Sequence, residues 1–220
     1  MKSDISVCGQ HRVFFGGDIP KRKAVIQKEI QKRGGDYMAT TFPGTTVEIT
    51  KYEKGASKAL FDGVFAAGGI TLSQLCIMTG LEPYLVQNWV KRGFVSSPKN
   101  RVYSRQQFAR VVIINMLRES LQIEKICNLI KVIGGEPDDT SDDLICDEEL
   151  YHRYVDMLSY VELNFSDRQV VRSAAERAAE DFSGDGADGK RKLVSILEVM
   201  LFAHTAARLR ETAEEIILMM

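Results

Sequence analysis

The chain contains 220 residues, of which 45% are hydrophobic and 27% are charged, as in an ordinary globular protein. Residues 1–15 have no continuous apolar core, and no stretch approaches the roughly 18 uninterrupted apolar residues of a membrane-spanning helix. At the level of sequence these features argue against a signal peptide and a membrane anchor, so we expect a cytoplasmic protein.

Charge is distributed unevenly along the chain. Residues 1–135 carry 20 Lys and Arg against 10 Asp and Glu, whereas residues 136–220 carry 9 against 20. A basic part joined to an acidic part is typical of a polyanion-binding region beside a region that does not bind. Solvated surfaces carry charge as well, so the asymmetry leaves both interpretations open.

Residues 1–69 are expected to form a basic N-terminal extension. A helix is predicted over about residues 20–33, because Pro20 suits a first helical turn and a glycine pair follows. This basic helix either presents a solvated face or adds a contact to a nucleic-acid backbone. Alternation over residues 46–50 predicts a short strand, and residues 57–67 predict a helix.

Two capping boxes mark the next segment. Thr71 with Gln74, and Ser104 with Gln107, each place a hydroxyl three residues before an amide. Such a pair can satisfy the unpaired N–H groups at the start of a helix. Helices are therefore predicted over residues 72–79 and about 105–119, and a further helix is predicted over 121–133.

Residues 71–92 have the order of a helix-turn-helix, in which a short capped helix, a tight turn and a second helix follow one another. The second helix begins at Pro83 and stops at Gly93. Trp89 is expected to anchor the core rather than stack on a base. The residues left outward on the second helix are Pro83, Tyr84, Gln87, Asn88 and Lys91.

Those outward residues suit a helix in the DNA major groove. Gln and Asn can pair with adenine, and Lys can contact phosphate or guanine. A merely solvated face is the alternative. The following loop, residues 96–102, would act as a wing, because Lys99, Asn100 and Arg101 can contact phosphate oxygens. Tyr103 is expected to pack the wing on the core.

Residues 136–149 are acidic and contain a proline, which predicts a linker before an additional helical C-terminal domain over residues 150–220. Its helices are predicted over 148–163, from a cap at 166–169 to about 182, and over 190–218, with a flexible loop at 183–189. Along the last helix, one series of seam positions loses its apolar character halfway, so no long regular coiled coil is expected. That series is Leu193, Leu197, Met200, His204, Ala207, Glu211, Glu214 and Leu218.

Local signatures of catalysis or metal binding are missing from the sequence. The four cysteines are scattered, the three histidines lie far apart, and no hydrolase, zinc or nucleotide motif is present. Cys76 and Cys127 are expected to be small buried hydrophobes. We therefore expect a protein that is not an enzyme and has no metal or cofactor, although a site assembled from distant residues would leave no local motif.

The run from Ile70 to Ile130 resembles the winged helix-turn-helix of MerR-type bacterial transcription regulators. The matching motifs include the Thr79-Gly80-Leu81 turn, Gly93-Phe94-Val95 followed by Pro98, and Arg101-Val102-Tyr103-Ser104. More narrowly, the chain resembles the uncharacterised bacterial domain-of-unknown-function family 1836, which offers no established activity. The resemblance implies a DNA-binding fold over residues 70–135.

The chain also departs from the MerR pattern. Tyr84 and Gln87 stand where MerR-type recognition helices usually bring arginines, the wing is short, and about 70 residues precede the module. The missing arginines, together with the acidic C-terminal half, favour an alternative to DNA binding, namely a protein–protein adaptor that retains the helix-turn-helix.

The sequence thus predicts a mainly α-helical protein with a MerR-like winged helix-turn-helix and an additional helical C-terminal domain. The leading hypothesis is a DNA-binding transcription regulator, a homodimer that binds double-stranded DNA through helix 83–92 and wing 96–102. A third hypothesis adds a small-molecule effector in a pocket lined by residues 150–205. The candidate DNA-binding residues are Tyr84, Gln87, Asn88, Lys91, Arg92, Lys99, Asn100, Arg101 and Arg105.

Overall fold

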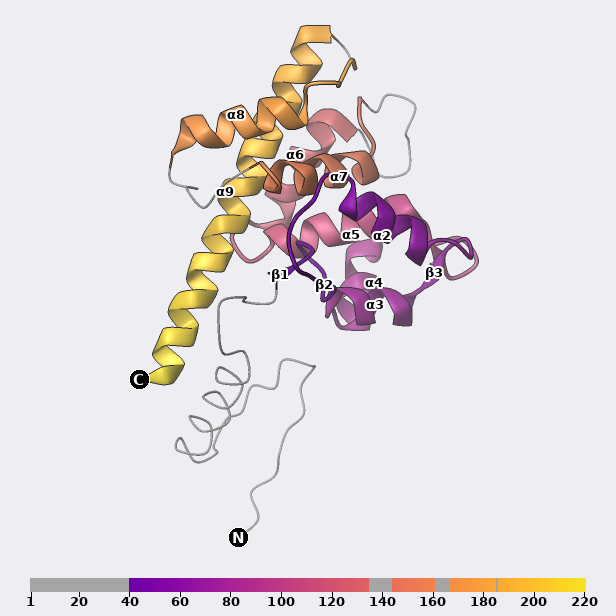
Figure 1. Cartoon of the computed structure of the whole chain (residues 1–220). Helices are drawn as coiled ribbons and strands as arrows, with labels where there is room; N and C mark the ends of the chain where they lie inside the picture. The colour runs from indigo at the N-terminus through magenta and orange to yellow at the C-terminus, as the bar shows by residue number, and fades with distance from the viewer. Residues whose placement is uncertain (1–39, 135–143, 161–166, 185) are drawn as a thin grey trace.

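The structure, a computed structural model, describes residues 40–134, 144–160, 167–184 and 186–220, and these residues are mainly helical (Figure 1). The predicted basic helix 20–33 and most of the predicted linker lie outside the described residues. The helices are α2 (Ala56–Val64), α3 (Leu72–Thr79), α4 (Pro83–Lys91), α5 (Arg105–Leu117), α6 (Ile123–Gly134), α7 (Asp147–Leu158), α8 (Arg168–Ala178) and α9 (Gly186–Met219). Within the described residues, no helix is long and apolar enough to cross a membrane.

The described strands are short and form two antiparallel pairs. Strand β1 (Thr40–Thr41) pairs with β2 (Glu48–Ile49), and β3 (Ile70–Thr71) pairs with β4 (Val102–Tyr103). In the first pair the connecting loop reaches the end of α3, where Thr46 donates its N–H to the Met78 carbonyl at 2.8 Å and its hydroxyl to the Ile77 carbonyl at 2.9 Å. The last carbonyls of a helix have no partner within it, so this loop completes α3.

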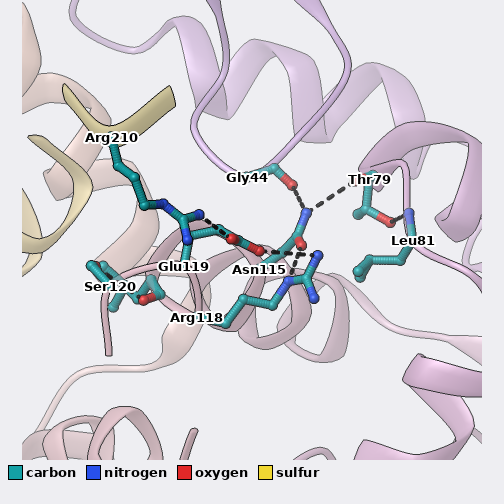
Figure 2. A network of polar contacts seen from close by, with 9 residues as sticks. Gly44, Thr79, Leu81, Asn115, Arg118, Glu119, Ser120 and Arg210 are labelled. Carbon is teal, nitrogen blue, oxygen red and sulfur yellow. Dashed lines mark hydrogen bonds and ion pairs between the residues drawn. The ribbon is translucent and has the colours of Figure 1, made fainter. Parts of the chain in front are cut away.

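Asn115 on α5 joins that loop to the end of α3 (Figure 2). Its Nδ2 donates to the Gly44 carbonyl at 3.0 Å and to the Thr79 carbonyl at 2.9 Å, and its Oδ1 accepts from Arg118 Nε at 3.0 Å. Gly44 has φ of 72°, and a Cβ there would lie 2.3 Å from the Val112 carbonyl oxygen, so the close approach requires glycine. One amide therefore fixes the position of α3 on α5.

Replacing Asn115 by Asp is expected to lower the free energy of unfolding by about 2–4 kcal/mol, because two carbonyls would lose their donor. Urea denaturation measures the change. Asn88→Asp, the same substitution at an exposed position on α4, should stay within about 0.5 kcal/mol of the wild type. Equal losses in both variants would show that the network does not hold α3.

Helix α5 occupies the centre of the core. Its residues from Gln107 to Ile114 are all buried, and α5 packs against α7 and α9, which come from the C-terminal half. The buried residues of residues 40–134 and of the later helices form one continuous cluster. The sequence predicts a linker at 136–149 that separates two domains. The described helices on the two sides of that segment instead share a single core.

Three C-terminal boundaries differ from the prediction. Helix α7 ends at Leu158 and α8 at Ala178, earlier than predicted, and α9 begins at Gly186, inside the predicted 183–189 loop. Asp188 in the first turn of α9 pairs with Arg191 and Lys192 one turn later. A carboxylate near a helix N-terminus and such i, i+3 and i, i+4 pairs stabilise the turn, which extends the helix through a glycine-rich stretch.

His204 on α9 lies 2.7 Å from the hydroxyl of the buried Tyr154 on α7, a distance measured from its Nδ1. Burial, with a smaller effect from Arg208, lowers the pKa of His204 from its ordinary value of 6.5 to about 4. The folded protein therefore holds this imidazole neutral at pH values at which the unfolded chain protonates it.

The free energy of unfolding is consequently expected to fall as the pH drops below about 6.5, because His204 then binds a proton in the unfolded state but not in the folded state. From the two pKa values the loss at pH 5 is about 2 kcal/mol. Urea denaturation at pH 7 and pH 5 measures it, and His204→Gln should remove this part of the pH dependence. An unchanged difference between the two pH values in the variant would contradict the assignment.

Candidate nucleic-acid interface

Helices α3 and α4 begin and end at the local sequence signals that predicted them. Thr71 accepts from the Gln74 N–H, and the Gln74 side chain accepts from the Thr71 N–H, so the predicted capping box is present. Gly80 adopts a left-handed conformation with φ of 69° and ends α3. Pro83 lies in the first turn of α4. Trp89 is buried, as predicted, and Leu75 and Val86 are buried as well.

The outer face of α4 carries the predicted polar residues. Tyr84 has 63% of its surface exposed, and Gln87, Asn88 and Lys91 are exposed as well. Gln87 and Asn88 lie three and four residues after Tyr84, and Lys91 lies three residues after Asn88, so all four share one stripe of the helix, opposite Val86 and Trp89. A duplex lying along this face would therefore meet the side chains that the sequence selected.

The segment after α4 ends in a tight hairpin. Lys99 forms a bridge with Val102, and the Val102 N–H donates to the Lys99 carbonyl at 2.9 Å. The two residues between them, Asn100 and Arg101, have φ of 51° and 63°. This is the pattern of a type I′ turn, in which both central residues take positive φ and Asn-Gly is the preferred pair. Arg101 thus occupies the position that usually takes glycine.

Gln107 holds the segment before this hairpin against α5. Its Oε1 accepts from the Ser104 N–H, while its Nε2 donates to the carbonyls of Ser96 at 3.0 Å and Ser97 at 2.9 Å. Tyr103, only 3% exposed, packs into the core beside it, as predicted. One capping residue therefore starts α5 and fixes Ser96 and Ser97, at the start of the predicted wing.

Two of the candidate residues already have acidic partners. Arg92 lies 2.6 Å from Glu124 on α6 and its guanidinium stacks 4.4 Å from the centre of the Phe94 ring. Arg105 contacts both Asp62 and Glu148 at 2.8 Å. By contrast, Lys91, Lys99 and Arg101 have no carboxylate within ion-pair distance among the described residues, and all are exposed. The structure therefore separates three available cations from two that link helices.

A chain of polar contacts that the sequence did not reveal connects α2 to α7. Ser57 Oγ lies 2.9 Å from His152 Nδ1, and His152 Nε2 lies 3.4 Å from Glu148 Oε1, the order of a nucleophile, base and acid. Ser57 is completely buried, and Glu148 also accepts from Arg105. A substrate cannot reach this hydroxyl in the described conformation, so the contacts join α2 to α7. Residues about 95 positions apart leave no local motif.

Three hollows are lined mainly by residues 150–205, and all are open grooves rather than enclosed sites. The largest of these three, about 480 Å³, lies between α2, α7 and α8 and is lined mainly by charged residues such as Glu149, Arg153 and Asp181. The predicted effector pocket has no enclosed counterpart there among the described residues. No group of three or more His, Cys, Asp or Glu within the described residues could hold a metal ion.

Comparison with known proteins gives one family and one relative. Residues 72–154 match a family described as a domain of unknown function, DUF1836. The chain is also similar to the uncharacterized protein YkrK of Bacillus subtilis (strain 168), with 31% identity over 101 residues. That alignment covers 44% of this chain and 43% of YkrK, so the chain spans less than half the length of this relative. No solved structure matches.

The family match runs from the first residue of α3 into α7 and contains all of the candidate residues. It therefore crosses the boundary that the sequence placed at 136–149. Helix α7 packs on α5 inside the matched segment, in agreement with the single core.

Proposed function

We propose that this protein is a DNA-binding transcription regulator whose α3, α4 and 99–102 hairpin act as a MerR-like winged helix-turn-helix. Helix α4 enters the major groove with Tyr84, Gln87 and Asn88 facing base edges, and the hairpin contacts the phosphate backbone. The observation that carries this proposal is a set of three exposed cations on these elements, Lys91, Lys99 and Arg101, that have no carboxylate partner within the part of the chain that the structure describes.

The backbone at Arg101 adds support. A residue other than glycine in the left-handed region costs of the order of 1–3 kcal/mol unless the surroundings favour it. At the tip of a two-residue turn, with its side chain exposed, Arg101 has no packing that would offset this cost. A contact between the Arg101 guanidinium and a phosphate would explain why arginine stands here, because glycine has no side chain that could make that contact.

The experiment is a titration of labelled genomic duplexes by fluorescence anisotropy at several salt concentrations. The wild type should bind at least one fragment more tightly than bulk DNA. Gln87→Ala/Asn88→Ala should reduce that preference, since each good base contact discriminates by about 1–3 kcal/mol. Lys54→Gln/Lys58→Gln, which removes exposed cations near α2, serves as the control. Binding no tighter than to bulk DNA would refute sequence-specific recognition.

We further propose that the regulator is a homodimer joined through α9. The second half of this helix extends beyond the other described helices (Figure 1) and is exposed. From Val199 to Ile216, six apolar residues of α9 recur at intervals of three and four residues and are exposed, which is the heptad spacing of a coiled coil. They are Val199, Phe202, Ala206, Leu209, Ala213 and Ile216.

The heptad series that the sequence analysis followed, from Leu193 to Leu218, lies on a different face of α9. Its first members, Leu193, Leu197 and Met200, are buried in the protein's own core, which explains why that series turns polar where α9 leaves the core. The exposed series lies on the face of α9 that the protein's own core leaves uncovered. If two copies of the chain pack through this face, each covers the exposed series of the other. A two-fold dimer of this kind would present two copies of α4 to a palindromic site.

Ile216→Glu is expected to shift the protein from dimer to monomer, measured by sedimentation equilibrium. Leu218→Glu is the matched control, because Leu218 is 59% exposed against 55% for Ile216 but stands off the heptad series. A monomeric wild type at tens of micromolar, or equal dissociation in both variants, would contradict the dimer.

A protein–protein adaptor is the second candidate, and two exposed apolar residues favour it. Ile77 on α3 and Tyr84 on α4 have 72% and 63% of their surface exposed, and aromatic residues are enriched in protein interfaces. Purification without nuclease distinguishes the candidates. Bound nucleic acid supports the regulator, whereas a defined protein partner whose binding is lost in Ile77→Glu supports the adaptor.

A further inference from the structure

The first two turns of α4 present polar side chains that carry no charge. Tyr84, Gln87 and Asn88 are exposed there, and residues 83–90 contain no lysine or arginine. Lys91 is the last residue of α4 and lies about 10 Å further along the helix axis than Tyr84. In a helix-turn-helix the early residues of the second helix meet the base edges. The part of α4 that would meet bases therefore offers one aromatic ring and two amides.

The amides of Gln87 and Asn88 are available to a partner. Both side chains are exposed, and neither makes a hydrogen bond within the part of the chain that the structure describes. A side-chain amide places an acceptor oxygen beside a donor NH₂ group. In the major groove adenine presents the complementary pair, an N7 acceptor beside an N6 donor, whereas guanine presents two acceptors. Two hydrogen bonds from one amide therefore select adenine.

Tyr84 adds an apolar surface to the same stripe of the helix. It is 63% exposed and precedes Gln87 and Asn88 by three and four residues. Among the four bases, thymine presents a methyl group in the major groove. Contact between the tyrosine ring and this methyl group removes apolar surface of both from water, which is favourable. Because thymine pairs with adenine, the same base pairs supply partners for the ring and for the amides.

Guanine is most often read by arginine or lysine, and the cations near α4 lie outside its first two turns. Arg92 follows the helix, and its guanidinium contacts Glu124 at 2.6 Å and lies 4.4 Å from the centre of the Phe94 ring. Lys99 and Arg101 belong to the hairpin. The early part of α4 thus lacks the side chains that favour G·C pairs.

We propose that α4 selects a run of A·T base pairs, in which Gln87 and Asn88 bond to adenines and Tyr84 packs against a thymine methyl group. This specificity rests on the proposed DNA-binding function and names the class of sequence that the site takes. The hairpin cations Lys99 and Arg101 contribute affinity, because phosphate contacts carry no sequence information directly.

The first test is a selection from a library of duplexes with a random core. The wild type is expected to enrich A·T pairs, and Gln87→Ala/Asn88→Ala is expected to lose that enrichment. Lys99→Gln is the matched control, because it also removes an exposed polar group but lies on the hairpin. This control should bind every duplex more weakly and keep the wild-type preference.

Modified bases in the selected duplex then test each contact by fluorescence anisotropy. Replacing thymine by uracil removes only the methyl group, and should weaken wild-type binding about fourfold, as for one buried group of that size. Replacing adenine by 7-deazaadenine removes the N7 acceptor, and should weaken it about tenfold. Tyr84→Ala should be insensitive to the first change, and Gln87→Ala/Asn88→Ala to the second.

The outcomes separate this specificity from the proposed function. If no duplex is preferred over bulk DNA, both are overturned. If the selected site consists of G·C pairs, or if neither modified base changes the affinity, the A·T specificity is overturned while DNA binding stands. Sensitivity to both modified bases that persists unchanged in the Tyr84 and Gln87/Asn88 variants would also overturn it, because other residues would then make the contacts.

Discussion

Replacing Arg110 by Met is expected to lower the free energy of unfolding by about 3–5 kcal/mol, because Asp147 would remain buried without its partner. Asp147 and Arg110 are both 3% exposed, and their contact links α5 to the first residue of α7. The loss therefore measures how strongly the two halves of the described chain depend on one another.

The double variant Arg110→Met/Asp147→Leu is the matched control. It removes both charges, and a buried ion pair replaced by apolar residues of similar volume is often neutral or stabilising. Urea denaturation of the wild type, the single variant and the double variant completes the comparison. A double variant as unstable as Arg110→Met would mean that the loss came from packing rather than from an uncompensated charge.

The loss in Arg110→Met should depend on pH. Burial already raises the pKa of Asp147 above its ordinary range, while Arg110 opposes that rise. Without Arg110 the folded pKa rises further, so the folded state retains a proton that the unfolded chain releases above about pH 4. Stability of the variant should therefore decrease as the pH rises from 4 towards 7, relative to the wild type.

Replacing Arg101 by Gly is expected to weaken DNA binding while leaving the fold intact or more stable. Glycine relieves the left-handed backbone of the turn, in which Asn-Gly is the preferred pair. The same change removes a cation at the tip of the wing. Combined with Lys99→Gln, it should reduce the slope of log K against log salt by about 1.8, from about 0.9 for each phosphate contact.

This variant separates stability from binding, which most charge substitutions do not. Thermal denaturation and fluorescence anisotropy on the same preparation give both quantities. If the variant is as stable as the wild type and binds DNA with the same salt slope, the wing does not contact DNA. A clear loss of stability would instead show that Arg101 has an internal role.

The sequence predicts the elements around the candidate interface well, because their signals are local. Thr71 with Gln74, and Ser104 with Gln107, specify helix starts through contacts only three residues apart, and both capping boxes are present. Gly93, with φ of 74°, follows the end of α4 as predicted. Inward and outward faces of α4 follow from helical spacing alone.

The features that the sequence could not predict depend on residues distant along the chain. Arg105 is predicted as a DNA contact from sequence, and its two ion pairs could not be foreseen because Asp62 and Glu148 are each 43 residues away. The sequence alone does not predict which face of α9 is exposed, because that depends on which face packs against the core. The Ser57–His152 contact and the Arg110–Asp147 pair arise in the same way, from helices brought together by a shared core.

The salt dependence of DNA binding tests the central proposal most directly. Wild type and the triple variant Lys91→Gln/Lys99→Gln/Arg101→Gly would be titrated with one duplex from low to physiological salt. If α4 and the wing contact DNA, the variant slope should be smaller by about 2.7 per protomer, from about 0.9 for each of the three cations. Equal slopes for the two proteins would contradict a DNA interface on this face.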